Sequence, residues 1–162
     1  MRDRIPPGPG QESCWDYPRP PALEPSPRLV RVMHGQHTIA ETRQAYRVLE
    51  TSHPPTWYLP PESVDMSALQ PSRMTSACEW KGHARYFDLM RDGARVEQVG
   101  WSYPQPTQRF AAIAGYVAFY GSKLTCFVDD EPVTSQPGDF YGGWITSDVV
   151  GPFKGGRGTW GW

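Results

Sequence analysis

The sequence predicts an all-β protein built from two packed antiparallel sheets of about eight short strands. Short segments of alternating apolar and polar residues recur along the chain, and each is bounded by a turn signal. The 16 Gly and 18 Pro among 162 residues leave little room for long helices. Evenly spaced short strands with almost no helix are typical of two packed sheets or a partly open barrel.

The N-terminal segment, residues 1–27, differs from the rest of the chain because it contains eight Pro and few aliphatic residues. It cannot pack a core of its own, so we expect an extended, polyproline-like arm. Trp15 and Tyr17 lie within this arm. Anchoring of these rings on the domain surface or on a second subunit is favoured over a free ligand for another protein.

The β domain is expected to span residues 28–135. Val30 and Val32 alternate with Arg31, and the two-residue turn at 35–36 predicts a hairpin. A helical turn is expected at 62–69, with Ser63 as its cap. The expected strands lie at 29–33, 37–41, 45–50, 57–59, 76–80, 84–90, 94–101, 113–120 and 124–128.

The stretch 101–121 is the most apolar part of the chain, and we expect the other strands to be organised around it. Its run 113–120 has almost no charge, which predicts a strand buried on both faces or capped on one side. The strand 124–128 is expected to return from 116–120 across the Gly-Ser-Lys turn at 121–123.

The C-terminal segment, residues 136–162, contains eight Gly and three Trp with little alternation. We expect this tail to dock on the domain or on a partner subunit, and arm and tail together suggest a homodimer. A phosphate-binding role for its glycines is weakly indicated, because no helix pattern follows them.

The charge and hydrophobic composition of the chain limits the classes of partner that we expect it to bind. The 16 basic and 17 acidic residues nearly balance, which argues against nucleic acid as a partner. The N-terminus has no apolar signal region and no segment approaches 18 apolar residues, so we expect a cytoplasmic protein that does not enter a membrane. Cys14, Cys78 and Cys126 are far apart without a Cys-x-x-Cys pair, so neither a disulfide framework nor a structural metal is expected.

Six residues form the candidate ligand site. Strand alternation allows a lysine ammonium, a carboxylate and several ring faces to converge on one concavity, which suits a small molecule held by hydrogen bonds and cation–π contacts. The alternative is an ordinary aromatic core with a structural ion pair between Glu50 and Lys81. The candidate residues are Glu50, Tyr58, Lys81, Tyr86, Trp101 and Tyr103.

Other candidates are weaker. Cys78 lies near Lys81 in sequence, but in a strand the two side chains point to opposite faces unless a turn intervenes. His34 and His37 flank a predicted turn and lack a third metal ligand. The acidic run 129–131 is followed by Pro132 and is typical of a solvated turn rather than a divalent-cation site.

Five segments in order carry a family resemblance: RVLETSHPP at 47–55, WYLPP at 57–61, CEWKGHARYF at 78–87, WSYP at 101–104 and IAGYVAFY at 113–120. Over roughly residues 28–135 the chain resembles the domain of unknown function 427 family of bacterial and fungal proteins. The resemblance implies a fold like the β-tent of methionine sulfoxide reductase B, Yippee proteins and the ligand-binding domain of cereblon. Many of those proteins hold zinc with four cysteines, which this chain lacks.

Three functions follow from the sequence. A small-molecule-binding β module with an aromatic-lined pocket is favoured, because rings are abundant and no catalytic set stands out. The family is also filed under a nucleotidyltransferase label, so a nucleotidyltransferase-like or phosphodiester-acting, nuclease-like enzyme is the first alternative. A structural protein that oligomerises through arm and tail is the second. The sequence indicates no cofactor and does not decide whether the protein is an enzyme.

Overall fold

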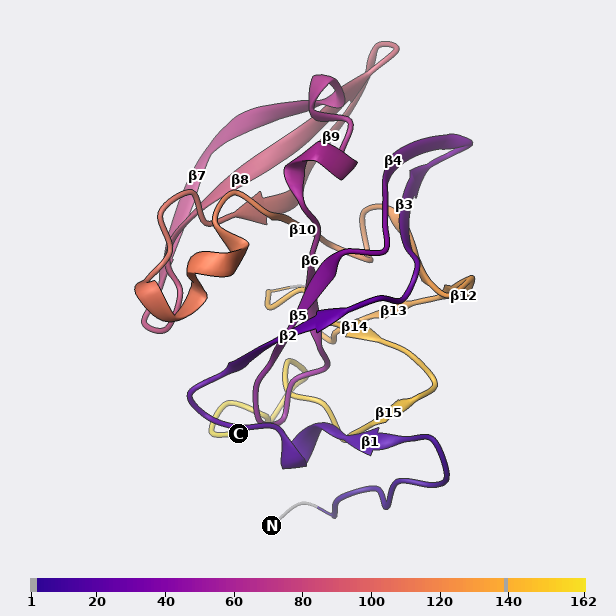
Figure 1. The fold of residues 1–162 in the computed structure, drawn as a ribbon, viewed down its shortest axis with the longest axis vertical. Coiled ribbons are helices and arrows are strands. Elements are labelled where there is room, and N and C mark those ends of the chain that lie inside the picture. Colours follow the sequence, from indigo (N-terminus) through magenta and orange to yellow (C-terminus); the bar gives the residue numbers. More distant parts are fainter. Residues whose placement is uncertain (1–2, 139) are drawn as a thin grey trace.

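The computed structural model describes residues 3–138 and 140–162 and is all-β, which confirms the predicted class (Figure 1). Short 3₁₀ turns are its only helices in those residues. The strands are β1 (Glu12–Ser13), β2 (Ala22–Ser26), β3 (Val30–His34), β4 (His37–Thr42), β5 (Ala45–Leu49), β6 (Thr56–Tyr58), β7 (Leu69–Cys78), β8 (Gly82–Arg91), β9 (Ala94–Ser102), β10 (Val117–Phe119), β11 (Thr125–Val128), β12 (Glu131–Pro132), β13 (Thr134–Ser135), β14 (Trp144–Ile145) and β15 (Val149–Val150).

Three antiparallel sheets carry the fold. Two have four strands, in the orders β10-β9-β8-β7 and β12-β11-β3-β4, and the third is β2-β5-β6. The long strands β7, β8 and β9 lie together at the top of Figure 1, and the β3–β4 hairpin lies beside them. Asp92 and Gly93 both have positive φ at the β8–β9 turn, as a two-residue hairpin turn requires.

Strand β7 is longer than the sequence predicts. It begins at Leu69 and continues through Pro71, whereas the expected strand began at residue 76. Proline cannot donate to a sheet, but β7 is the edge strand of its sheet and tolerates it. The expected helical turn at 62–69 becomes two single 3₁₀ turns, η2 (Pro61–Ser63) and η3 (Met66–Ala68), and Ser63 Oγ bonds the Pro60 carbonyl instead of capping a helix.

The apolar run 113–120 forms a shorter strand than predicted. Residues Gln108–Ile113 form the 3₁₀ segment η4, Gly115 turns the chain at φ +75°, and only Val117–Phe119 enter the sheet, all three buried. The predicted pairing of 124–128 with this strand is wrong. The amides of Lys123 and Leu124 both donate to the Tyr120 carbonyl, and after this tight turn β11 pairs with β3 and β12.

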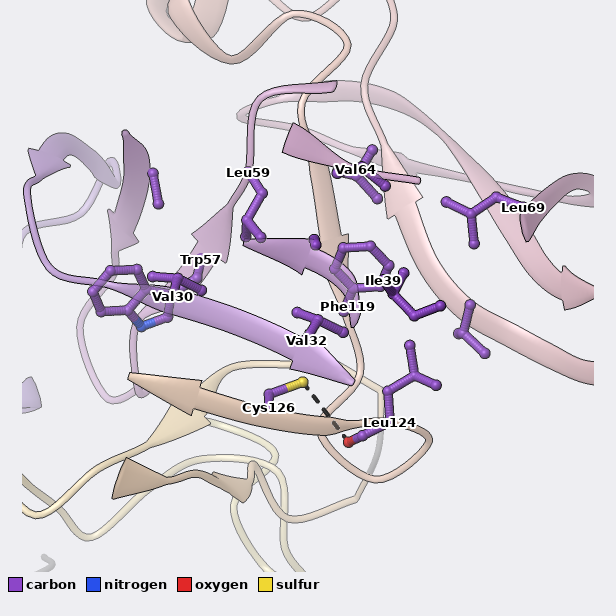
Figure 2. Close-up of a cluster of buried hydrophobic side chains, with 14 of the residues drawn as sticks. Val30, Val32, Ile39, Trp57, Leu59, Val64, Leu69, Phe119, Leu124 and Cys126 are labelled. Atoms are coloured by element: carbon purple, nitrogen blue, oxygen red, sulfur yellow. Dashed lines mark hydrogen bonds between the residues drawn. The ribbon is translucent and has the colours of Figure 1, made fainter. Parts of the chain in front are cut away.

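The main hydrophobic core lies between the β3–β4–β11 sheet and the strands β6, β9 and β10 (Figure 2). Val30 and Val32 of β3 are fully buried in it, as their alternation predicts. Leu59 and Phe119 complete the centre of the cluster, and Trp144 enters it from the C-terminal segment. A second cluster, rich in Tyr and Trp, forms on the other side of β6 and β9 and positions the candidate site.

Strands β1 and β15, near the two ends of the chain, lie next to each other at the bottom of Figure 1. Strand β1 pairs in parallel with β15, and β2 pairs with β5 of the domain. Trp15 Nε1 donates to the Pro152 carbonyl over 2.8 Å. Arm and tail therefore contact each other and the domain, while the division of the chain at residues 27 and 135 stays a prediction.

Candidate functional site

A cavity of about 260 Å³ lies on the aromatic side of the fold, and each of the six predicted residues lines it. They reach it from separate parts of the chain. Glu50 follows β5, Tyr58 ends β6, Lys81 lies in the β7–β8 turn, and Tyr86 belongs to β8. Trp101 is in β9, and Tyr103 follows that strand, so its ring stays on the same face as Trp101.

The rings form a contiguous wall. Trp101 meets Tyr58 edge to face, with centroids 6.3 Å apart and planes at 89°. Tyr120 lies 4.7 Å from Trp101, and Tyr103 lies 6.3 Å from Tyr58. Edge-to-face and offset contacts at these distances are favourable because the positive edge of one ring meets the negative face of another.

Two hydroxyl groups of this wall, those of Tyr58 and Tyr103, keep their protons. Burial raises the pKa of both Tyr58 and Tyr103 above the usual phenol value. Trp101 Nε1 donates to the Tyr58 oxygen over 3.2 Å, so the hydroxyl hydrogen of Tyr58 is available for another acceptor. Tyr86 Oη pairs with Ser76 Oγ at 2.9 Å on the neighbouring strand.

Lys81 is held at the cavity by the loop before η4. The Thr107 amide donates to the Lys81 carbonyl over 3.0 Å, and Thr107 Oγ1 donates to the Trp80 carbonyl over 2.6 Å. The Lys81 ammonium lies 5.9 Å from the centroid of the Tyr103 ring. Within residues 3–138 and 140–162, no carboxylate lies within 4.0 Å of this ammonium.

Glu50 does not pair with Lys81, in contrast to the alternative interpretation of these two residues as a structural ion pair. Its Oε2 atom lies 3.4 Å from Arg19 Nη2 and 3.6 Å from His53 Nε2. Arg19 belongs to the N-terminal arm, and its Nη2 also donates to the Thr51 carbonyl. Arg19 of the N-terminal arm therefore supplies the positive charge that pairs with Glu50, a residue of the cavity lining.

A buried polar network behind Glu50 was not predicted from the sequence. Gln136 Nε2 donates to His53 Nδ1 over 3.0 Å and to the Lys154 carbonyl over 2.7 Å, while Gln136 Oε1 accepts the Gly143 amide. With Nδ1 as an acceptor, the ring carries its proton on Nε2, which faces Glu50. Burial, followed by the charges of Lys154, Arg19 and Lys81, lowers the pKa of His53 to about 3.

The C-terminal segment closes one side of the cavity. Phe140 and Tyr141 line it, and Tyr141 packs edge to face on His53 with centroids 4.7 Å apart. The sequence signals for this contact were the adjacent glycines 142 and 143, which allow a chain to approach rings closely. They could not indicate which rings the segment would cover.

The structure places the weaker candidates as follows. Cys78 lines the same cavity as Lys81, because the turn at 79–80 intervenes and removes the strand alternation that would separate them. His34 and His37 oppose each other in register, and His37 Nε2 lies 3.0 Å from Asp65 Oδ2.

The carboxylates of the acidic run 129–131 are each occupied. Asp129 binds Arg28 at 2.7 Å, Asp130 binds Arg31 at 2.9 Å, and Glu131 accepts bonds from the Ser147 amide and hydroxyl. In the part of the chain that the structure describes, no three His, Cys, Asp or Glu side chains are grouped to hold a metal ion. None of the helices in those residues has the length and apolarity that crossing a membrane requires.

Fold and cavity together define an all-β domain with a buried aromatic cluster. The chain belongs to the family described as Domain of unknown function (DUF427), which matches residues 22–130. The match confirms the resemblance drawn from the five segments and includes each of the six predicted site residues. Phe140 and Tyr141 lie outside the matched region. A comparison with curated proteins finds no match.

Proposed function

We propose that the protein is a small-molecule-binding β module and that its ligand occupies the aromatic-lined cavity. The observation that carries the proposal is the convergence on one concavity of rings and polar groups from β6, β7, β8 and β9, from the turns beside them and from the C-terminal segment. Ligand sites are typically concave and lined by apolar and aromatic groups, with a few polar groups that fix orientation. Trp101 is the buried Trp of the ring wall, and it would supply the stacking surface.

The experiment is a thermal-shift screen for ligands, followed by titration of the wild type and variants. Replacing Trp101 by Ala should cost about 1–2 kcal/mol of binding, roughly five- to thirtyfold in affinity. A second variant, Trp101→Leu, keeps apolar volume without a ring and guards against loss of fold. Equal affinities of folded Trp101 variants and wild type would place the ligand elsewhere.

Trp57→Phe is the matched control. Trp57 is also a buried Trp, but it belongs to the main hydrophobic core and does not line the cavity. Replacing Trp57 by Phe should lower the stability of the protein, because packing contacts in the core are lost, and should leave the ligand affinity unchanged. A loss of affinity in this control as large as in Trp101→Ala would show that the effect comes from the fold, not from the cavity.

The other predictions on function stay predictions. The nucleotidyltransferase-like or nuclease-like alternative needs free carboxylates, and those of residues 129–131 are bound to Arg28, Arg31 and Ser147. Turnover of nucleotides or nucleic acid with magnesium, lost in an Asp129→Asn and Asp130→Asn double variant, would favour that enzyme instead. The homodimer through arm and tail and the cytoplasmic location also stay predictions.

A further inference from the structure

The charges around the cavity are unevenly arranged. The Glu50 carboxylate is already engaged by Arg19 and His53. Lys81 is a half-buried residue whose ammonium lies 5.9 Å from the centroid of the Tyr103 ring, and no carboxylate of the described residues lies within 4.0 Å of that ammonium. A cation held among rings and without a countercharge has given up part of its hydration, so it gains from an anion that binds there.

Positive charges gather around His53 on this side of the cavity. After burial, the causes that lower its pKa are the charges of Lys154, Arg19 and Lys81, in that order. These three cations face one half-buried carboxylate of the cavity lining, that of Glu50. Glu79 also lines the cavity, but it is exposed at the rim, where solvent screens its charge.

The neutral polar groups of the cavity also favour an acceptor. The phenols of Tyr58 and Tyr103 are protonated at neutral pH, and Tyr58 accepts its hydrogen bond from Trp101, so its own hydrogen is left to donate. A cavity of about 260 Å³ is at the small end for ligand sites, which suits one small ring system with a single polar group.

Building on the function proposed above, we propose that the ligand class is a small planar ring that bears one anionic group, a carboxylate or a phosphate. The ring stacks in the wall formed by Trp101, and the Lys81 ammonium binds the anion. The sequence alone does not decide whether the ligand is an anion or a cation, because the Glu50 carboxylate could neutralise the Lys81 ammonium. The Arg19–Glu50 pair removes that balance.

The test uses four probes with one common ring: 2-naphthoate, 2-naphthyl phosphate, 2-naphthamide and 2-naphthylmethylamine. Each is titrated by calorimetry into the full chain at neutral pH. At least one of the two anions should bind roughly tenfold or more tightly than the neutral amide, and the amine should bind most weakly. Comparison of the two anions distinguishes a carboxylate ligand from a phosphate ligand.

Two lysine variants assign the preference. Lys81→Met keeps the length of the side chain and removes its charge, so the anions should fall to the affinity of the amide while the amide is unchanged. Lys123→Met is the control, because Lys123 lies in the turn before β11 and does not line the cavity. It should keep the preference for anions.

The outcomes separate this inference from the function on which it rests. Equal binding of anions and amide, or tightest binding of the amine, with all probes weakened by Trp101→Ala, would overturn the anion preference and leave the ligand cavity in place. A preference for anions that survives Lys81→Met would overturn the role of Lys81. Failure of all four probes to bind at millimolar concentration would count against the ligand cavity itself.

Discussion

The backbone of Gly142, in the C-terminal segment, packs directly against the indole ring of Trp101. A Cβ atom at residue 142 would lie 2.3 Å from Cη2 of Trp101 and 3.1 Å from the Tyr120 ring, and the backbone φ is +78°. Both the close approach and the left-handed backbone require glycine. The chain at Gly142 is thus packed on a ring that lines the cavity.

Gly142→Ala should therefore weaken both the fold and the site. The added methyl group must displace either the segment or the Trp101 ring, and overpacking of this kind costs about 1–3 kcal/mol of unfolding free energy. Urea unfolding measures the loss, and titration with the naphthalene probes measures the accompanying fall in affinity. Gly161→Ala is the control, because a Cβ atom at residue 161 would have no other atom within 4 Å. Identical unfolding midpoints for the two variants would contradict the close contact.

Replacement of Trp144 by Ala should destabilise the protein far more than replacement of Trp160 by Ala, although both residues lie in the Gly-rich segment. Trp144 is 1% exposed, stacks on Trp57 and donates from Nε1 to the Phe119 carbonyl over 2.8 Å, whereas Trp160 is 89% exposed. Trp144→Ala should cost about 3–5 kcal/mol of unfolding free energy. Trp160→Ala should stay within about 0.5 kcal/mol of the wild type. Chemical denaturation of both variants measures these changes in unfolding free energy. A small loss of stability in Trp144→Ala would mean that the Gly-rich segment does not complete the hydrophobic core.

Much of the fold was predictable because local patterns determine it. The alternation of Val30 and Val32 predicted the buried face of β3, and the two-residue turn at 35–36 predicted the β3–β4 hairpin. The strand in 113–120 was overestimated because an apolar run does not show where a chain turns. Gly115 ends the 3₁₀ segment there, and only the last part of the run reaches the sheet.

Which residues line the cavity was predictable, whereas the hydrogen bonds and ion pairs around them were not. Rings two apart in an extended segment share a face whatever the rest of the chain does, as Trp101 at the end of β9 and Tyr103 directly after it show. The bond between His53 and Gln136 spans 83 positions, and the Arg19–Glu50 pair joins the arm to the domain. Contacts between residues so far apart in the chain leave no periodic signal in a single sequence, so neither of these two contacts was predicted.

His53 should make the stability of the protein depend on pH. Its pKa is lowered to about 3 by burial and by nearby cations, whereas an unfolded histidine titrates near 6.5. Between these values the unfolded chain binds more protons than the folded one, so the free energy of unfolding falls as the pH falls. The stabilising contribution is fully present above about pH 6.5 and is lost as the pH drops toward 3, with a loss of about 2 kcal/mol between pH 7 and pH 5.

His53→Asn tests this dependence, because its side-chain oxygen can replace Nδ1 as the acceptor for Gln136 and cannot take up a proton in this range. Urea unfolding at pH 7 and pH 5 should show a smaller loss of stability on acidification for this variant than for the wild type, even if the variant is less stable at both pH values. Other titrating groups are common to both proteins and cancel in the comparison. His83→Asn removes an exposed histidine and should keep the wild-type dependence. The same loss for the wild type and His53→Asn would mean that His53 is accessible to protons in the folded protein, and that burial and the nearby cations do not keep the ring neutral.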